Sequence, residues 1–200
     1  MTTYAVTRPS TAEAAYPYAS APQNSSDAAL LERIAKGDQL GMRTLYARHH
    51  VLVYRFVLRI LRDQLAAEDV LSEVFLDVWR QAKNFEGRSS VATWLLAIAR
   101  YKSLSILRRR SEIALDDELA EAIHDPADTP ELALLKKDQA ALLRQAIAEL
   151  PPNQTEVLDL VYYHGKTVAE VAQISGIPEA TVKTRMFYAR KKLAELVKAA

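Results

Sequence analysis

Hydrophobic side chains recur every three to four residues from about Leu30 onward, the spacing of one face of an α-helix. No stretch shows the strict alternation of a half-buried strand, and glycine is scarce, with 5 residues. We therefore expect an all-α protein. The pattern predicts helices over residues 30–62, 66–82 and 91–110, and a further helical set that resumes near residue 131.

Two segments lack this periodicity and divide the chain. Residues 1–28 are rich in Ala, Ser, Thr, Pro and Tyr, which predicts a disordered tail. Residues 111–138 are acidic and contain Pro126 and Pro130, which is typical of a flexible linker. The expected architecture is two small helical domains, residues 29–110 and 139–200, joined by this linker.

The most specific local motif lies in the second domain. Thr167 and Glu170 have the spacing of a capping box, which predicts the start of a helix. Ser175-Gly176-Ile177 forms a turn, and Pro178 suits the beginning of the next helix. The result is a helix-turn-helix.

The second helix of this motif has two distinct faces. Its inward stripe is apolar, and its outward face combines basic, polar and aromatic side chains, as expected of a helix that enters a DNA major groove. A helical hairpin with a solvated basic face would give the same pattern. The inward residues are Val182, Met186, Ala189 and Leu193, and the outward residues are Lys183, Thr184, Phe187, Arg190 and Lys191.

The helix predicted over residues 66–82 also has two faces. One half is apolar, from Ala67 to Trp79, and the other half carries Asp69, Glu73, Leu76 and Asp77. An acidic face with a leucine, inside a basic domain, indicates a docking surface for a basic partner helix. The alternative is an ordinary solvated face with one stray leucine.

Residues 84–110 combine aromatic and basic side chains. Phe85 lies in a predicted loop, and Trp94 lies on a helix with Arg100 and Lys102 that ends in three arginines. Aromatic rings stack on unpaired bases while cations follow the backbone, so this segment suits single-stranded DNA. Trp94 could equally be a core residue.

The distribution of charge along the chain supports the division into two domains and a linker, although the net charge is only +1. Residues 30–110 hold 15 Lys and Arg against 8 Asp and Glu, residues 111–138 hold 2 against 9, and residues 139–200 hold 8 against 6. Two basic blocks around an acidic connector suggest two modules that face nucleic acid.

Several classes of function are disfavoured by the composition. The chain has no cysteine, so disulfides, thiolate metal sites and cysteine nucleophiles are excluded. Its four histidines are scattered without metal-ligand spacing, and the Asp116-Asp117-Glu118 cluster lies in the acidic linker. We expect no cofactor, no metal and no catalysis. The absence of a signal peptide and of a membrane-spanning stretch favours a cytoplasmic protein.

Taken together, these segments resemble the sigma-70 family of RNA polymerase sigma factors, extracytoplasmic-function (ECF) group. Residues 67–79 look like the polymerase-binding helix, residues 85–110 like the promoter-melting and −10-element region, and residues 150–193 like the −35-element domain. Ser72, Tyr101 and Ser105 depart from the residues often found at those positions. The resemblance covers roughly residues 30–193, about four fifths of the chain. The three motifs occur in the order and at the spacing that the family shows.

The resemblance implies core RNA polymerase, promoter DNA and an anti-sigma factor as partners, without membrane insertion. Three sets of residues are then expected to make contacts. The polymerase-binding set is Asp69, Glu73, Leu76 and Asp77; the −10 set is Phe85, Arg88, Trp94, Arg100, Lys102, Arg108 and Arg109; the −35 set is Lys183, Thr184, Arg185, Phe187 and Arg190.

Two rival classes explain part of the sequence. A dimeric helix-turn-helix regulator would use the second domain and leave the first unexplained. A sigma mimic that titrates anti-sigma factors would not need the DNA-facing residues. The linker has two interpretations as well: an acidic segment that occupies the RNA path of polymerase, or a solvated tether.

Overall fold

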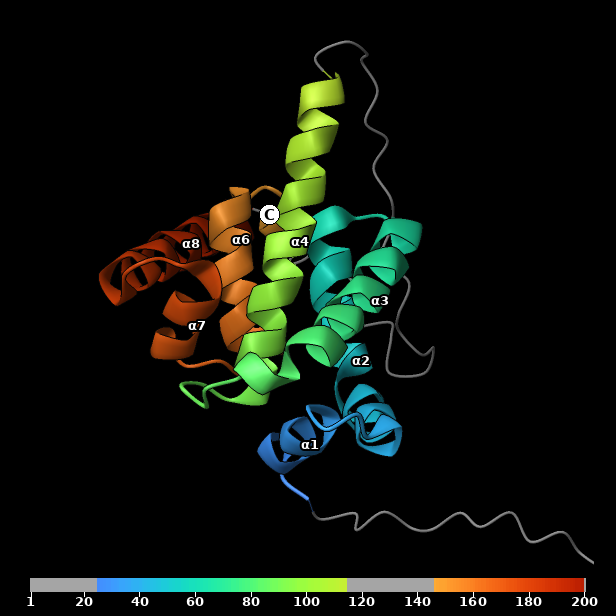
Figure 1. Cartoon of the computed structure of the whole chain (residues 1–200). Helices are drawn as coiled ribbons and strands as arrows, with labels where there is room; N and C mark the ends of the chain where they lie inside the picture. The colour runs from blue at the N-terminus through green and yellow to red at the C-terminus, as the bar shows by residue number, and fades with distance from the viewer. Residues whose placement is uncertain (1–24, 115–145, 200) are drawn as a thin grey trace, which may run out of the picture.

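A computed structural model describes residues 25–114 and 146–199, and every regular element within these ranges is a helix (Figure 1). This confirms the all-α class for the described residues. The predicted tail up to residue 24, and residues 115–138 of the predicted linker, lie outside them, so both linker hypotheses stay predictions. The first part of the chain forms α1 (Asp27–Ile34), α2 (Gln39–Leu61), α3 (Gln64–Gln81), the 3₁₀ turn η1 (Ala82–Asn84) and α4 (Val91–Ala114). The second part forms α6 (Pro152–Leu158), the π-helical turn η2 (Asp159–Tyr163), α7 (Val168–Ser175) and α8 (Glu179–Ala199).

Side-chain caps set the beginnings of the first three helices. Ser26, Asp38 and Asp63 each accept hydrogen bonds from backbone N–H groups in the first turn of the helix that follows. The first helix thus starts at Asp27, earlier than the hydrophobic periodicity indicates, because the cap and not the first buried residue defines its start. At the other end of the domain α4 continues to Ala114, past the predicted end at residue 110, since no glycine or proline interrupts it.

The first domain is built around α2, α3 and α4. Apolar side chains from these helices meet α1 in one core, and α2 contributes its whole inward stripe. Leu95 is fully buried and Ile98 is partly buried, as the helical periodicity predicts. The fully buried large residues of this core are Leu30, Leu31, Ile34, Leu45, Val53, Phe56, Val57, Val70, Val74, Leu95 and Leu96.

The helix-turn-helix of the second domain is confirmed. Thr167 and Glu170 form the reciprocal capping box at the start of α7, and Gly176 ends that helix with a positive φ of 65°. Val182, Met186 and Ala189 on α8 are buried. The polar and basic side chains on the other side of α8 therefore face solvent.

The two domains are packed against each other, which the sequence does not predict. One hydrophobic core contains Phe56 and Leu95 of the first domain together with Leu160 and Val171 of the second. Figure 1 shows α4 in the centre, with α2 and α3 on one side and α6 and α7 on the other. We call this arrangement the closed form.

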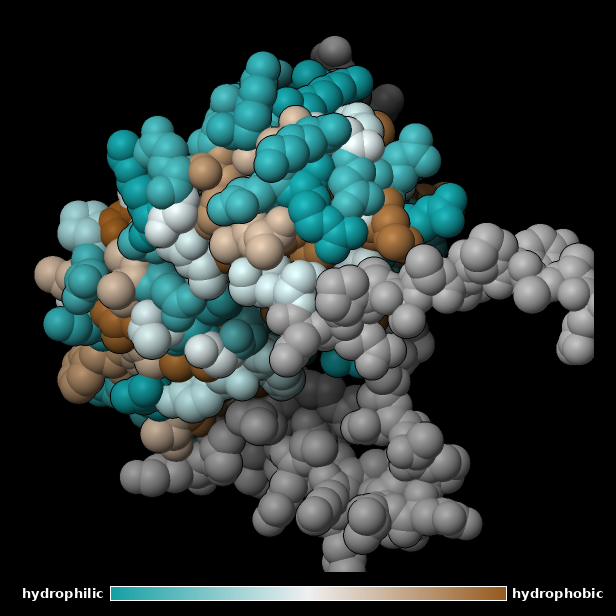
Figure 2. Space-filling model, turned by 60° about the horizontal axis from the view of Figure 1, so that its bottom comes forward, coloured by the Kyte–Doolittle hydropathy of each residue, from teal (hydrophilic) through white to brown (hydrophobic). Residues whose placement is uncertain are grey.

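The surface is mainly hydrophilic on the face seen in Figure 2, where hydrophobic side chains are scattered among polar ones. None of the described helices is both long enough and apolar enough to cross a lipid bilayer.

Candidate nucleic-acid and polymerase interfaces

The outward face of α8 is open to solvent near its beginning. Lys183, Thr184 and Phe187 are exposed, and Phe187 keeps 63% of its surface accessible while its ring meets Tyr188 edge to face at 5.4 Å. Arg185 is half-buried. A cation, a hydroxyl and an apolar ring on one exposed helix face can contact base edges and thymine methyl groups in a major groove.

Arg190, further along α8, is held by a tyrosine. Its Nε donates a hydrogen bond of 2.9 Å to the hydroxyl of Tyr162 in η2, and its guanidinium lies 5.7 Å from the centre of the Tyr162 ring. Both residues are exposed. The tyrosine reduces the freedom of a long side chain and leaves the remaining guanidinium donors available to an anion.

Substitutions on α8 should separate base readout from phosphate contact. Lys183→Ala should cost about 1–3 kcal/mol on the preferred duplex and relax preference at one base pair. Arg190→Ala should weaken binding to all sequences and lower the salt slope by about 0.9. Both are measured by titrating holoenzyme with variant duplexes at several salt concentrations. Identical effects of the two substitutions on specificity and salt dependence would contradict this division.

The outward face of α3 carries the predicted polymerase-binding residues. Asp69 and Glu73 are exposed, and Leu76 keeps 53% of its surface accessible. Trp79, which the helical pattern assigns to the apolar half, is 38% exposed, whereas its neighbour Val78 is fully buried. The face therefore combines two carboxylates with two large apolar side chains.

Two of the predicted sets are joined by one lysine. The ammonium of Lys102 lies 3.1 Å from a carboxylate oxygen of Glu73 and 2.8 Å from one of Asp77. Burial alone would lower the pKa of Lys102, but hydrogen bonds to Asp77 and Glu73 outweigh it and raise the pKa. Lys102 belongs to the predicted −10 set, and in this structure two carboxylates hold its ammonium.

The loop between η1 and α4 is stabilised by an aromatic pair. The rings of Phe85 and Trp94 lie 5.2 Å apart, and both side chains are half-buried against the core. Trp94 thus packs on the core and supports the loop, while its contact with DNA stays a prediction. Arg88, at the exposed end of the loop, pairs with Glu86 at 2.5 Å.

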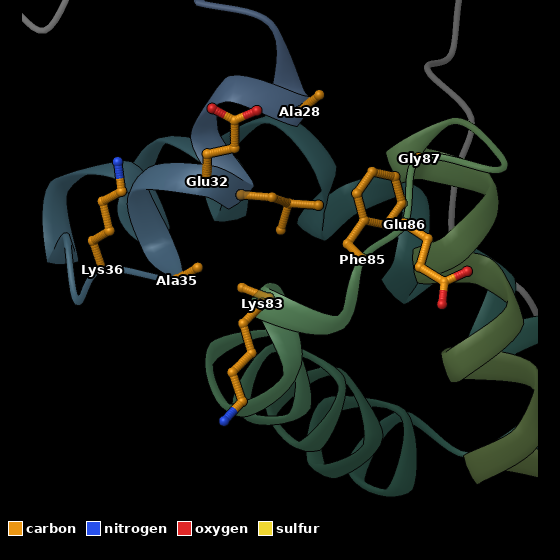
Figure 3. A pocket seen from close by; sticks show the side chains of 10 residues that line it. Ala28, Glu32, Ala35, Lys36, Lys83, Phe85, Glu86 and Gly87 are labelled. Carbon is orange, nitrogen blue, oxygen red and sulfur yellow. The ribbon is translucent and has the colours of Figure 1, made fainter.

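An open pocket of about 570 Å³ lies beside this loop. Figure 3 shows α1 with Ala28 and Glu32 on one side and the segment that carries Lys83, Phe85 and Gly87 on the other. Its volume falls in the range of small-molecule sites, and its lining mixes an aromatic ring with charged side chains.

The remaining cations of the −10 set lie in two environments. Arg108 and Arg109 are exposed near the end of α4. Arg100 lies against the second domain, where it forms an ion pair with Glu156 of α6. The structure therefore brings Phe85 and Trp94 together, leaves Arg88 exposed in the same loop, and places Arg100 in the contact between the domains.

A polar cluster joins α4 to the capping box of α7. The hydroxyl of Thr93 donates to the Glu170 carboxylate at 2.7 Å, and the ammonium of Lys166 lies 3.3 Å from the same oxygen. The other oxygen of Glu170 accepts from the backbone N–H of Thr167 at 3.0 Å. The backbone bond from Thr167, the hydrogen bond from Thr93 and the charge of Lys166 lower the pKa of Glu170 to about 2.

Ionisation of the Glu170 carboxylate should make the free energy of unfolding depend on pH in the acidic range. Folding lowers its pKa from 4.5 to about 2. Its stabilising effect is therefore complete above the unfolded pKa and is lost as pH falls through that interval. Because Glu170 is partly exposed, we expect Glu170→Gln to cost about 1–2 kcal/mol at neutral pH.

Urea unfolding followed by circular dichroism measures the free energy of unfolding of wild type and of Glu170→Gln. The difference between the two should become smaller as pH is lowered from about 5 to about 3. Glu149→Gln, at an exposed carboxylate of the same domain, is the control and should change stability little. A difference between wild type and Glu170→Gln that stays constant over this range would contradict the assignment.

Sequence reasoning missed the residues that close the domain contact. Arg59 of α2 forms an ion pair with Asp159 of η2, one hundred residues away, and its guanidinium stacks on the Tyr163 ring at 3.6 Å. His164 meets Phe56 edge to face at 5.5 Å, and burial together with the charges of Arg59, Lys166 and Arg55 lowers its pKa to about 4. No local sequence pattern indicates such contacts, because nothing in the neighbouring sequence distinguishes these residues from other polar residues on a helix.

Within the described ranges no group of acidic or histidine side chains is arranged to hold a metal ion.

Two family models match the chain, one in each domain. The model described as Sigma-70 region 2 covers residues 45–113, and that described as Sigma-70, region 4 covers residues 140–193. Among curated proteins, the chain is 30% identical to an RNA polymerase sigma-H factor of Pseudomonas aeruginosa, over 84% of this chain and 91% of that protein. It is 31% identical to the ECF RNA polymerase sigma factor SigK of Mycobacterium tuberculosis, over 86% and 94%.

Solved structures share the fold. CnrH in complex with the cytosolic domain of CnrY superposes with a TM-score of 0.63 at 21% identity, over 88% of this chain and 99% of that one. The sigma factor RpoE, in complex with the anti-sigma factor NepR from Bartonella quintana, gives a TM-score of 0.65 at 24% identity, over 78% and 96%.

Proposed function

This chain belongs to the ECF group of the sigma-70 family of RNA polymerase sigma factors, and we propose that it directs core polymerase to particular promoters and helps to open the −10 region. It acts in the cytoplasm as a non-catalytic initiation factor without a cofactor. Region 2 corresponds to the first domain and region 4 to the second, with residues 111–138 as the link.

The observation that carries this proposal is the coexistence of two unlike surfaces. The basic, aromatic face of α8 suits duplex DNA, and the exposed face of α3 around Asp69 and Leu76 suits a protein partner with basic side chains. A dimeric helix-turn-helix regulator needs only the first surface. A mimic that titrates anti-sigma factors needs no face like that of α8.

An anti-sigma factor is part of the proposal. RpoE, one of the structures that share this fold, is bound to an anti-sigma factor. The exposed apolar side chains on α3 offer such a partner a surface that overlaps the proposed polymerase site.

The domains must separate when both promoter elements are bound. If the two elements lie on the order of two helical turns apart, their separation is ~70 Å. In the closed form both domains share a single core. The promoter complex therefore requires an open form in which the contact between α4 and α7 is broken.

Run-off transcription tests the proposal. Purified core polymerase plus this chain should initiate at discrete sites on genomic templates taken upstream of its own gene, and core alone should not. Binding to core without any transcript from such templates would favour the mimic. Duplex binding without any affinity for core would favour the ordinary regulator.

A further inference from the structure

Arg190 of α8 is held by a neutral side chain. Its Nε donates to the hydroxyl of Tyr162 at 2.9 Å, and its guanidinium carbon lies 5.7 Å from the centre of the tyrosine ring. Other arginines of the described ranges pair with carboxylates; these are Arg33, Arg48, Arg59, Arg88, Arg100 and Arg110. A phenol carries no charge, so it orients the guanidinium of Arg190 without neutralising it.

The π-helical turn η2 carries Tyr162 to the surface. The backbone N–H of His164 donates to the carbonyl of Asp159 at 3.1 Å, five residues back, so the turn is wider than an α-helical one. Leu160 in this turn is fully buried, whereas Tyr162 and Tyr163 keep 61% and 62% of their surface accessible. Single π-helical turns are rare and occur frequently at functional sites. This one presents two consecutive tyrosines to solvent, and the first of them meets α8.

The Tyr162 hydroxyl can bind a second group. A phenolic hydroxyl accepts one hydrogen bond while it donates another, and here it accepts from Nε of Arg190. Its own proton is therefore available, and the adjacent positive charge polarises the O–H bond and strengthens it as a donor. The Nη groups of Arg190 remain as further donors, because the bond to the tyrosine uses Nε. A neutral O–H and charged N–H groups thus lie side by side on an exposed surface.

This set of donors matches a backbone phosphate. A phosphodiester presents two unesterified oxygens that share one negative charge, and arginine and tyrosine are among the side chains that bind such oxygens. Arg190 follows Phe187 by three residues on α8, so it lies beside the exposed face that carries Lys183 and Thr184. A duplex that contacts this face brings its sugar-phosphate backbone alongside. The ligand is therefore one phosphodiester group at the edge of the bound duplex.

We infer that Tyr162 and Arg190 together bind one backbone phosphate of the duplex that α8 contacts. Arg190 supplies the charge, while Tyr162 donates a hydrogen bond from its hydroxyl and fixes the direction of the guanidinium. This rests on the proposed function and deepens it, because η2 joins α8 in the DNA-binding surface. Contacts with phosphates set the orientation and register of a protein on the duplex without reading its sequence.

A purely structural role is the alternative. In that case the hydrogen bond would only attach η2 to α8, and its loss would lower the free energy of unfolding. Both side chains are exposed, so the bond competes with water and contributes little to stability. The helix that leads into η2 is already joined to α8 through the buried cluster of Leu150, Leu158 and Ala189. The exposed pair is therefore not needed for that contact.

The central experiment titrates holoenzyme with the promoter duplex that run-off transcription identifies. Tyr162→Phe keeps the ring and removes the hydroxyl. We expect it to weaken duplex binding about 3- to 10-fold, the effect of one lost hydrogen bond, by the same factor on every sequence. Because tyrosine is neutral, the salt slope should stay near that of wild type, whereas Arg190→Ala should lower it by about 0.9. Tyr163→Phe removes the hydroxyl of the neighbouring exposed tyrosine and, as the matched control, should bind like wild type.

A map of single phosphates tests whether the two residues share one ligand. Backbone phosphates are replaced one at a time by neutral methylphosphonates, and wild type should lose affinity at the contacted position. Tyr162→Phe and Arg190→Ala should each lose less than wild type at that same position and as much as wild type elsewhere. Each variant has already lost part of the contact that the methylphosphonate removes. A hydrogen bond that only stabilises the fold would not change the map.

Three results would overturn the shared phosphate site. The first is duplex binding by Tyr162→Phe equal to that of wild type, and the second is a pair of maps in which Tyr162→Phe and Arg190→Ala differ at different phosphates. The third is a lower melting temperature of Tyr162→Phe with an unchanged map. Failure of the proposed function looks different, because wild-type holoenzyme would then bind no promoter duplex, and both proposals would fall together.

Discussion

Asp69→Lys combined with Leu76→Ala should reduce affinity for core polymerase on the order of 10³-fold. Both side chains are exposed on α3, and in the proposed interface we expect the loss of each contact to cost about 2 kcal/mol. The lysine also places like charges against a basic partner. Because neither residue contributes to the core, the melting temperature should stay within a few degrees of wild type.

Asp69 and Leu76 are substituted and Glu73 is not, because Glu73 also contacts another helix. Glu73 belongs to the same face, but it pairs with Lys102, so its substitution would also change α4. Glu149→Lys reverses an exposed carboxylate of the second domain and serves as the control. Affinity is measured by competition with a labelled reference sigma factor. If the double variant and the control bind core equally well, the docking face lies elsewhere.

Local signals in the sequence predict much of the fold. The capping box of Thr167 and Glu170, the turn at Gly176 and the buried stripe of α8 each depend on residues within one or two turns of one another. The predicted start of α1 is wrong by three residues, because Ser26 caps the helix before its apolar face begins. Helix ends depend on caps more than on periodicity.

The contact between the domains could not be predicted in the same way. Arg59 and Asp159 are one hundred residues apart, and neither has a neighbour in sequence that marks it as part of a pair. The same limit applies to Lys102, which the sequence assigns to DNA and the structure pairs with Glu73 and Asp77. Composition indicates that a surface is basic, but only the fold shows which of its charges are already paired.

Loss of the Phe85 ring should slow promoter opening. We propose that an extruded base of the −10 element enters the pocket beside α1 and stacks on Phe85, whose ring lies 5.2 Å from that of Trp94. Stacking of a base on an aromatic ring contributes about 1–3 kcal/mol, so Phe85→Leu should lower the equilibrium for open complex about 5- to 150-fold. Leucine retains the apolar contact with the core, and duplex binding through α8 should remain near wild type.

Permanganate reactivity of unpaired thymines in the holoenzyme–promoter complex measures this step. Tyr46→Leu is the matched control, since Tyr46 is an exposed aromatic residue on α2 that packs on His50 and Phe75 and has no proposed contact with DNA. A template with a pre-opened −10 region separates the breaking of base pairs from the later stacking of the extruded base on Phe85. Phe85→Leu should still weaken retention of the open strand there, because stacking acts after the base pairs are broken. Thymine reactivity equal to that of wild type on the duplex template would contradict a role for Phe85 in holding the base.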